Sequence, residues 1–563
     1  MKLADLPLRG PDVDFQALEF DYQRAPDHDR PTPARHPLVV VGAGPVGLAL
    51  AIDLAQRGLP VLLLDDDHRL STGSRAICFA KRTLEIFDRL GCGEPMVAKG
   101  VSWHTGRVVC RDQQVYSFDL LAEGGHERPA FINLQQYYVE GQLAMRAARL
   151  PHLEVRWNSR LVGLAQDAGG ATLTVESPDG RYLLQADYVA ACDGSRSSAR
   201  KLLGLESRGQ VFRDRFLIAD VKMEAPEQAA AGPRACGVPS VGVDTPAERW
   251  FWFDPPFHPG QSVLLHKQAD NVWRIDFQLG WDADPEEEKK PANILPRVRA
   301  LLGPGARFEL VWASVYTFAC MRMDKFRHGR VLFAGDAAHG VSPFGARGAN
   351  SGVQDADNLG WKVAAVLRGE APDALLDSYA SEREDAADEN IRHSTRSTDF
   401  ITPKSPVSRM FRDAVLQLAR RHPFARGLVN SGRLSQPTVL AGSPLLTPDA
   451  DRFAGALQPG APAVDAPLNG GWLLRSLAHG GFTALVFGDP ASEAAQAGVP
   501  LLHIPQAPGN ALAWQRYDAQ PGTVYLLRPD QHICARWRRP SATAVAAARQ
   551  RALGHAQTGT EDA

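Results

Sequence analysis

The sequence has no excess of one charge and no long hydrophobic run. Lys and Arg number 62 and Asp and Glu number 64, which gives a formal net charge of -2. Without a basic excess, the composition offers no general attraction to nucleic acid or to an acidic membrane surface. The longest apolar stretch, residues 37–52, is interrupted by glycines and stops at Asp53, so it is too short to span a bilayer. We therefore expect no nucleic-acid partner and no membrane partner.

Cysteines are few and scattered along the chain. There are seven, and no two of them form a CxxC pair. An odd number at such spacing argues against a disulfide framework and against a zinc cluster, so no metal site is expected. Residues 1–36 are polar and lack the apolar core of a signal peptide. Together these features predict a reducing, cytoplasmic compartment.

The length and composition are those of a globular protein of several domains. The chain has 563 residues, of which 44% are hydrophobic and 22% charged, and this length predicts about three domains. Past Ser435, Pro and Gly become frequent, which indicates a linker. The expected division is an arm at 1–36, an α/β domain formed by 37–210 and 320–435, a sheet domain at 211–319, and a linker with a small α/β domain at 436–563.

The first motif that suggests chemistry is a glycine-rich turn between a strand and a helix. An apolar, β-branched run at 38–41 leads into Gly42-Ala43-Gly44-Pro45-Val46-Gly47, and a second buried strand at 61–64 ends at Asp65. The glycines allow a tight turn and a close approach of backbone N–H groups to a pyrophosphate, while the acid is placed to bind a ribose hydroxyl. The unit predicts the binding of FAD or NAD.

Two further motifs follow buried strands. Asp193-Gly194 begins a DGxxSxxR string after the strand at 188–191. Gly335-Asp336 follows the strand at 330–334 and continues into the glycine-rich stretch 343–352. A helix that starts in this stretch would stabilise negative charge on a bound ring, and glycines allow a flat ring to press against the backbone. The motif that begins at Gly335-Asp336 therefore predicts a site for a polyol chain and a planar ring.

The three motifs in this order resemble the group A flavoprotein monooxygenases, the para-hydroxybenzoate hydroxylase-like family. The strings Gly73-Ser74-Arg75-Ala76 and Gln136-Tyr137-Tyr138-Val139-Glu140 are also similar to that family, and the resemblance covers about residues 37–400. The C-terminal part resembles the thioredoxin-like domain of the phenol hydroxylase and 3-(3-hydroxyphenyl)propionate hydroxylase branch. It lacks a CxxC, which favours packing or dimerisation over a redox role.

The resemblance implies an α/β fold with a Rossmann-like FAD-binding domain, an interleaved β-sheet substrate domain and a C-terminal thioredoxin-like domain. It also implies a cofactor site in three parts. The ADP part of FAD would be held by Gly42, Gly44, Pro45, Val46, Gly47, Asp65 and Asp66. Its pyrophosphate and ribityl chain would contact Arg75, Gln136, Asp193, Gly335 and Asp336, with Asp193 also serving a transient nicotinamide. The flavin ring would be lined by Pro343, Gly345, Gly348, Ala349 and Asn350.

The activity that the resemblance implies is an aromatic hydroxylation. NADH or NADPH would reduce FAD, O2 would form a flavin C4a-hydroperoxide, and this species would hydroxylate a phenolic or related aromatic ring. A phenol must lose its proton during this reaction, so a general base is expected. The candidates for catalytic roles are His266, Tyr316, Arg322, Arg347 and Pro343, each of which is open to a purely structural interpretation. Ala346-Arg347 before Gly348 departs from the family's commoner GQGxN pattern. Two roles are open for Arg347: a contact with substrate or flavin, or a surface charge. A homodimer is expected because dimers are common in this branch.

Two other functions compete with the hydroxylase. Flavin-dependent halogenases carry a WxWxIP string, and Trp250-Phe251-Trp252-Phe253-Asp254-Pro255 comes close to it, although Asp254 replaces the Ile. The complete DG motif at Asp193 favours direct use of a nicotinamide and hence the hydroxylase. The remaining alternative is a flavin-binding protein without catalytic activity.

Overall fold

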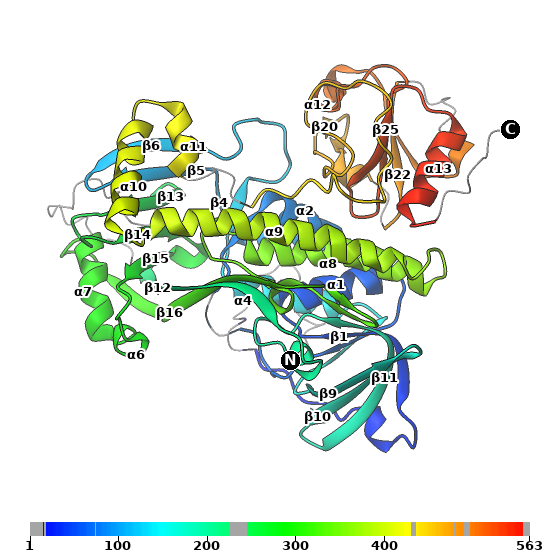
Figure 1. Cartoon of the computed structure of the whole chain (residues 1–563), viewed down its shortest axis with the longest axis horizontal. Helices are drawn as coiled ribbons and strands as arrows, with labels where there is room; N and C mark the ends of the chain where they lie inside the picture. The colour runs from blue at the N-terminus through cyan, green and yellow to red at the C-terminus, as the bar shows by residue number, and fades with distance from the viewer. Residues whose placement is uncertain are drawn as a thin grey trace.

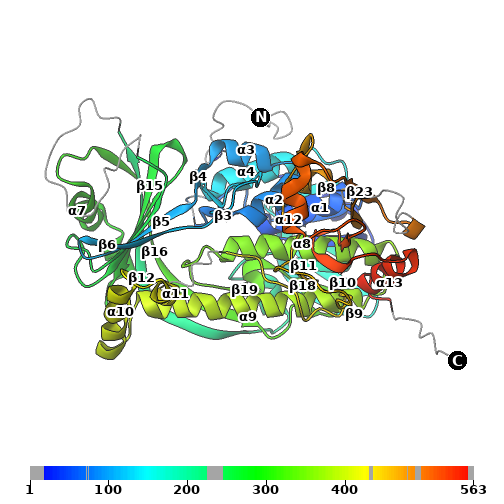
Figure 2. The ribbon, with the colours of Figure 1, turned by 90° about the horizontal axis from the view of Figure 1, so that it is seen from above.

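The computed structural model describes residues 15, 18–71, 73, 75–224, 245–429, 435–477, 480–488 and 496–555. Residues 1–14, 16 and 17 of the predicted N-terminal arm lie outside these residues, as do Ser74 and Cys236. Two large sheets lie at different places along the molecule, two long helices run beside them, and the C-terminal region lies at the end opposite the second sheet (Figures 1 and 2). Within the described residues, no helix is both long enough and apolar enough to cross a membrane.

The first sheet carries the dinucleotide-binding pattern. Its central strands run in the order β18-β11-β1-β2-β8 and are parallel. Strands of parallel sheets are covered on both faces, which agrees with the buried apolar run at residues 38–41. Helix α1 (Pro45–Gln56) connects the first two strands and packs against α4 (Gln136–Ala147) and α8 (Gly348–Leu367). The strands are β1 (Ala34–Val41), β2 (Val61–Leu64), β8 (Leu153–Arg156), β9 (Arg160–Asp167), β10 (Gly170–Ser177), β11 (Gly180–Ala191), β17 (Arg327–His328) and β18 (Val331–Phe333).

The expected boundary between arm and sheet at residue 36 is three residues too late. Strand β1 already begins at Ala34, because residues 34–36 pair with residues 184–186 of β11. The preceding segment is also held in place: Phe20 stacks on Trp157 with ring centroids 4.0 Å apart.

The second sheet is antiparallel except at one pair of strands. Its order is β19-β16-β12-β15-β14-β13-β5-β6, and β13 runs parallel to β5. It therefore takes two strands from residues 105–119, which lie outside the predicted range 211–319 for the sheet domain. Its strands are β5 (Thr105–Cys110), β6 (Gln113–Asp119), β12 (Ser207–Met223), β13 (Arg249–Phe253), β14 (Ser262–Lys267), β15 (Val272–Leu279), β16 (Phe308–Met323) and β19 (His339–Gly340).

Helices and one small sheet link these two layers. Helix α9 (Leu375–Ile401) packs along α8 and also contacts β16, so it joins the first sheet to the second (Figure 2). The small sheet has the order β3-β7-β4, from β3 (Cys78–Ala80), β7 (Phe131–Asn133) and β4 (Val101–Trp103). The other helices are α2 (Lys81–Arg89), α3 (Gly93–Lys99), α5 (Ser198–Leu202), α6 (Pro285–Glu288), α7 (Pro291–Leu302), α10 (Pro406–Ala419) and α11 (Pro423–Val429).

The C-terminal region forms a four-stranded sheet of its own. The order is β23-β22-β24-β25, in which β22 and β23 are parallel and the other pairs antiparallel. This arrangement is consistent with a thioredoxin-like fold, which stays a prediction. The elements are β20 (Pro467–Leu468), β21 (Gly471–Trp472), β22 (Thr483–Phe487), β23 (Leu501–Ile504), α12 (Ala511–Arg516), β24 (Val524–Leu527), β25 (Ile533–Trp537) and α13 (Ala542–Ala552).

Candidate functional site

A cavity of about 640 Å³ lies where the first and second sheets meet. Its walls come from the β1–α1 turn, the end of β2, the start of α4, the loop after β11, residues 334–350 and one face of the second sheet. Cavities of roughly 300–1,000 Å³ are typical of sites for small molecules and cofactors. The motifs that are far apart in the sequence thus border a single space.

The glycine-rich turn is shaped by close contacts of the backbone. Gly42 has a φ of +102°, and a Cβ there would lie 2.5 Å from the carbonyl oxygen of Cys192. A Cβ on Gly47 would lie 1.9 Å from the carbonyl oxygen of Gly42, so only glycine lets helix α1 pack against its own turn. Gly44, Pro45 and Val46 line the cavity, whereas Gly47 does not. The positive end of the α1 dipole therefore faces the cavity, as a pyrophosphate site requires.

Asp65 at the end of β2 supports this turn. One carboxylate oxygen, Oδ2, accepts a hydrogen bond from the Ala43 N–H at 2.5 Å, and Oδ1 accepts one from the Asp67 N–H at 2.9 Å. Burial raises the pKa of the Asp65 carboxyl to about 6, against the effect of these backbone donors. Asp66 lines the cavity beside it. Contact of these two acids with a ribose stays a prediction.

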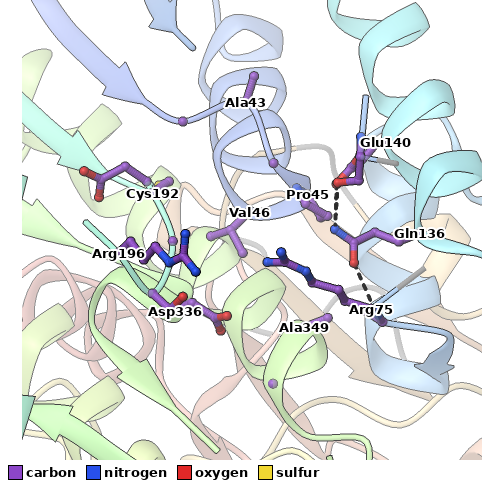
Figure 3. Close-up of a pocket in the computed structure, with 18 of the residues that line it drawn as sticks. Ala43, Pro45, Val46, Arg75, Gln136, Glu140, Cys192, Arg196, Asp336 and Ala349 are labelled. Carbon is purple, nitrogen blue, oxygen red and sulfur yellow. Dashed lines mark hydrogen bonds between the residues drawn. The ribbon is translucent and has the colours of Figure 1, made fainter. Parts of the chain in front are cut away.

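Arg75 extends its guanidinium into the middle of the cavity, between the start of α1 and Asp336 (Figure 3). The chain that carries it is fixed by Gln136, whose Oε1 accepts from the Ala76 N–H at 3.0 Å and whose Nε2 donates to Glu140 at 2.7 Å. None of the described residues forms a hydrogen bond or an ion pair with the Arg75 guanidinium. Arg75 is thus an open cation, which suits an anionic ligand such as a pyrophosphate.

The two aspartates of the later motifs lie across the cavity from α4. Asp193 Oδ2 accepts from the Ala199 N–H at 3.0 Å, and burial raises the pKa of the Asp193 carboxyl. The Asp336 side chain opens into the cavity but is enclosed by protein, and this burial raises the pKa of its carboxyl as well. Gly335 lies beneath it with a φ of +62°, and a Cβ there would be 2.9 Å from Val46 Cγ2. That close packing sets Asp336 at the cavity wall.

The stretch before α8 forms the wall predicted for the flavin ring. Pro343, Gly348, Ala349 and Asn350 line the cavity, and α8 begins at Gly348. The Asn350 amide is a brace, because its Nδ2 donates to the carbonyl oxygen of Cys78 at 2.8 Å and its Oδ1 accepts from the Ala80 N–H at 2.8 Å. Gly345 lines a neighbouring small cavity instead.

Four of the five predicted catalytic residues line the cavity: His266, Tyr316, Pro343 and Arg347. Arg347 is buried, where its Nη1 donates to Asn390 Oδ1 at 3.0 Å and burial lowers its pKa. It is therefore a cavity residue rather than a surface charge.

The placement of Arg322 in the catalytic centre is wrong. Its guanidinium binds Asp388 on α9 at 2.6 and 2.8 Å and is partly exposed to solvent. Arg322 and Tyr316 share strand β16, but six residues of strand separate them by about 20 Å. Strand β16 extends beyond the cavity, so the position of Arg322 along the chain was not enough to predict that its side chain lies at the site.

Sequence reasoning named His266 but missed the buried polar cluster around it. Arg249, Arg274 and Asp276 of the second sheet and Cys78 of β3 line the cavity with His266. His266 Nε2 lies 3.8 Å from Asp276 Oδ2, and its Nδ1 lies 4.0 Å from Cys78 Sγ. The signal that could have found it is the alternation of polar residues in the strand at 272–279, where Arg274, Asp276 and Gln278 share one face.

Two members of this cluster, His266 and Asp276, have pKa values that bear on proton transfer. Burial, reinforced by Arg249 and Arg274, holds the pKa of His266 well below its usual range, so the imidazole is neutral. Burial raises the pKa of the Asp276 carboxyl to about 6, although Arg274 and Arg249 oppose the shift. Shifts of this kind gather at functional sites. As for metals, the described residues contain no group of three or more His, Cys, Asp or Glu side chains that could hold an ion.

The chain is similar to known flavin-dependent proteins. A family model described as an FAD binding domain matches residues 35–394. A 3-(3-hydroxy-phenyl)propionate/3-hydroxycinnamic acid hydroxylase of Mycolicibacterium smegmatis is 32% identical over 71% of this chain and 67% of its own length. A flavin-dependent monooxygenase of Mycobacteroides abscessus is 30% identical over 88% of this chain and 96% of its own length.

Solved structures show the same fold over most of the chain. The flavin-dependent monooxygenase PieE, solved with FAD and substrate, superposes with a TM-score of 0.76 at 22% identity, over 93% of this chain and 100% of that one. The p-nitrophenol 4-monooxygenase PnpA from Pseudomonas putida DLL-E4 gives a TM-score of 0.60 at 25% identity, over 71% of this chain and 97% of that one.

Proposed function

We propose that this chain, which belongs to the FAD binding domain family, is an FAD-dependent monooxygenase that hydroxylates a phenolic or related aromatic ring, with NADH or NADPH as reductant and O2 as oxidant. The observation that carries the proposal is the shared cavity. It joins a dinucleotide-type turn and the open Asp336 carboxylate to a polar cluster on the second sheet. One end suits a flavin nucleotide and the other suits an aromatic molecule.

The residues present fit FAD. The N-termini of α1 and α8 both face the cavity, and Asp336 offers an acceptor for the ribityl hydroxyls. Arg75, which has no hydrogen-bond or ion-pair partner for its guanidinium among the described residues, offers a cation for the pyrophosphate. Pro343, together with the first residues of α8, would support the ring. The chemistry that bound FAD supplies is the transfer of reducing equivalents from NAD(P)H and the activation of dioxygen.

The protein's own contribution begins with positioning the substrate and excluding water. Ile218, Leu264, Phe318 and Phe344 line the cavity at the second sheet, and each is at least nine-tenths buried. Such a wall accepts a flat ring and keeps the reacting atoms dry, which strengthens every polar interaction inside.

We assign the removal of the phenol proton to Asp276 and His266. A base works best when its pKa lies near the operating pH, and the Asp276 carboxyl, at about 6, satisfies this condition. The neutral His266 ring projects from β14 with Nδ1 near Cys78 and Nε2 3.8 Å from Asp276 Oδ2, so it can accept the proton at one nitrogen and pass the proton on the other to Asp276. Tyr316 borders the same space, and its pKa is raised by burial, so it stays protonated.

The homodimer and the cytoplasmic location stay predictions. The dimer is supported by an apolar face on α10 and α11, where Val407, Met410, Phe411 and Phe424 are each more than half exposed. Exposed apolar groups that gather in this way typically mark an interface, here with a second copy of the chain. Phe411→Asp should yield monomers in light scattering, whereas the same change at the exposed Leu183 should leave the mass unchanged. Identical masses for both variants and the wild type would refute the interface.

The halogenase alternative is not favoured, because the relatives reported above are hydroxylases and monooxygenases. In addition, Trp252 of the halogenase-like string is buried in β13, where Trp250 stacks on it with ring centroids 5.5 Å apart. The aromatic run therefore packs the sheet.

The test of the proposed function is NAD(P)H consumption by the FAD-loaded protein over a panel of phenols, with product mass measured in parallel. A rate stimulated by one phenol, with a product heavier by one oxygen atom, is the expected result. Formation of hydrogen peroxide without a hydroxylated product would mean that the ligand stimulates the reduction of FAD but is not positioned for the transfer of oxygen to its ring. No stimulation by any aromatic compound would refute the hydroxylase, and a non-catalytic flavoprotein would retain FAD without oxidising NAD(P)H.

A further inference from the structure

The segment that precedes the first sheet packs against a wall of the cavity. Residues 18–33, which we call the arm segment, come before β1, and the match to the family model begins at residue 35. Phe20 of this segment is 8% exposed and stacks on Trp157, with ring planes inclined by 15° and centroids 4.0 Å apart. Trp157 lines the cavity, whereas Phe20 does not. A residue outside the matched domain therefore supports a wall of the candidate site.

Trp157 lies at the end of the cavity where the ADP part of FAD is expected. It follows β8 directly, and the next two residues bind the chain after β2. The Asn158 N–H donates to the carbonyl oxygen of Asp67 at 3.0 Å. The Ser159 N–H donates to the carbonyl oxygen of Asp65 at 2.7 Å. The indole is thus a neighbour of the acid predicted to meet the ribose, and it belongs to the nucleotide end of the site.

The arm segment is fixed to the same two parts of the chain. The Phe20 N–H donates to the carbonyl oxygen of His68 at 2.7 Å. Asp27 Oδ2 forms an ion pair with Arg156 Nη2 at 2.7 Å, and both side chains are more than nine-tenths buried. Arg156 is the residue before Trp157, and breaking a buried ion pair is strongly destabilising. The arm segment is therefore held on both sides of the stacked rings, which keeps Phe20 against the indole.

We infer that Trp157 is the surface on which the adenine ring of FAD packs, and that Phe20 holds the indole in place for it. This inference rests on the FAD binding of the proposed function. A nucleobase is flat and has a π face, so it packs well on an aromatic side chain. A side chain that is already fixed in its bound position loses less conformational freedom when the ligand arrives. Trp157 is a cofactor-binding residue in this arrangement, and Phe20 is a positioning residue.

The test compares FAD with FMN, which carries the same ring and ribityl phosphate but lacks the adenylate. Each flavin is titrated into the full-length protein from which flavin has been removed, and binding is followed by flavin fluorescence without NAD(P)H. The variants are Trp157→Leu, Trp157→Phe, Phe20→Ala and the double variant of Phe20→Ala with Trp157→Leu. Leucine fills the space without a π face, and phenylalanine keeps one. The control is Tyr22→Ala, because Tyr22 is an aromatic residue of the arm segment that contacts Ser177 and Asp179, outside the cavity.

The loss should be confined to the flavin that carries adenine. Trp157→Leu should raise the Kd of FAD roughly 10-fold or more and the Kd of FMN less than about 3-fold. Trp157→Phe should keep most of the affinity for FAD. Phe20→Ala should raise the Kd of FAD roughly 5-fold and add little when Trp157 is already leucine, because it acts through the indole. Tyr22→Ala should match the wild type with both flavins.

Three results would overturn the inference. In the first, Trp157→Leu weakens FAD and FMN by the same factor, which would mean that the indole only supports the fold. In the second, Trp157→Leu binds FAD as tightly as the wild type does. In the third, Phe20→Ala has its full effect in the Trp157→Leu background, which would mean that the arm segment acts elsewhere. A protein that shows the expected losses for FAD alone but forms no hydroxylated product would refute the proposed function and leave this inference intact.

Discussion

Two buried clusters of charged side chains in this protein are organised differently. Between α8, α9 and the C-terminal region, Glu382 binds Lys362 at 2.7 Å and Arg528 at 2.6 Å, and Arg528 also binds Asp530 at 2.6 Å. Every one of these side chains is paired. At the cavity, by contrast, Arg249 has no partner within the described part of the chain.

The difference separates a stabilising site from a binding site. Burial alone would raise the pKa of Glu382, but Arg528 and Lys362 outweigh it and hold the pKa well below its usual range. The carboxylate is therefore charged at any ordinary pH, and its charge is neutralised within the protein. The cavity cluster leaves charge uncompensated, which lowers stability and provides affinity for a ligand. An open buried charge thus indicates where an external molecule belongs.

The largest effect should follow from opening the paired cluster. Arg528→Met would leave Glu382 and Asp530 buried with too few cations, and removing one partner of a buried pair costs roughly 3–5 kcal/mol. Urea unfolding should show a loss of this size. Arg322→Met, which breaks a partly exposed pair, should cost at most about 1 kcal/mol. Equal losses of unfolding free energy in the two variants would mean that the cluster does not stabilise the packing of the C-terminal region.

Removing the ribityl acceptor tests the cofactor end of the cavity. Asp336→Ala should weaken the retention of FAD by roughly 1–3 kcal/mol, because a buried hydroxyl would lose its acceptor. The ratio of flavin to protein absorbance after dialysis measures this loss. Asp336→Asn keeps an acceptor and should retain more FAD than the alanine variant. Unchanged occupancy in Asp336→Ala would show that the ribityl site is placed wrongly.

The proton acceptor should give the reaction a pH dependence. Asp276 accepts a proton only as a carboxylate, and its pKa is about 6. The value of kcat/KM should therefore be constant above that pH and fall about tenfold per unit as the pH drops below it. Asp276→Asn should lower the rate and remove the inflection. An inflection that survives in the asparagine variant would assign it to another group.

The smallest effect should come from the open cluster, and it should have the opposite sign to that of Arg528→Met. Arg249→Met removes a buried charge that has no partner among the residues the structure describes, so the free energy of unfolding of the ligand-free protein should stay the same or rise by about 1 kcal/mol. Urea unfolding under the conditions used for Arg528→Met gives the comparison. A loss above about 2 kcal/mol would mean that Arg249 has a structural partner, which would remove the contrast between the two clusters.

The cofactor end of the site could be predicted from the sequence because its signals are local. Gly42, Asp193 and Asp336 each belong to a short string that follows a buried strand, and parallel strands place their carboxyl ends at one edge of a sheet. The structure brings all three motifs to one cavity. The predicted strand at 61–64 also agrees with β2.

The substrate end could not be predicted in the same way, because its contacts join distant parts of the chain. Strand β5 pairs with β13 across about 140 residues, and no local pattern announces a parallel pair of that separation. The cluster of Arg249, His266 and Asp276 is assembled only once β13, β14 and β15 align. The paired cluster likewise joins Glu382 to Arg528, which belong to different predicted domains.

The origin of the oxygen in the product decides most clearly whether the protein is a monooxygenase. The FAD-loaded protein would be supplied with NADPH or NADH, ¹⁸O₂ and the phenol that most stimulates reductant consumption, and the product would be analysed by mass spectrometry. We expect one ¹⁸O atom in an aromatic hydroxyl group of the product. A product without the label, or reductant consumed without any aromatic product from any phenol, would contradict it.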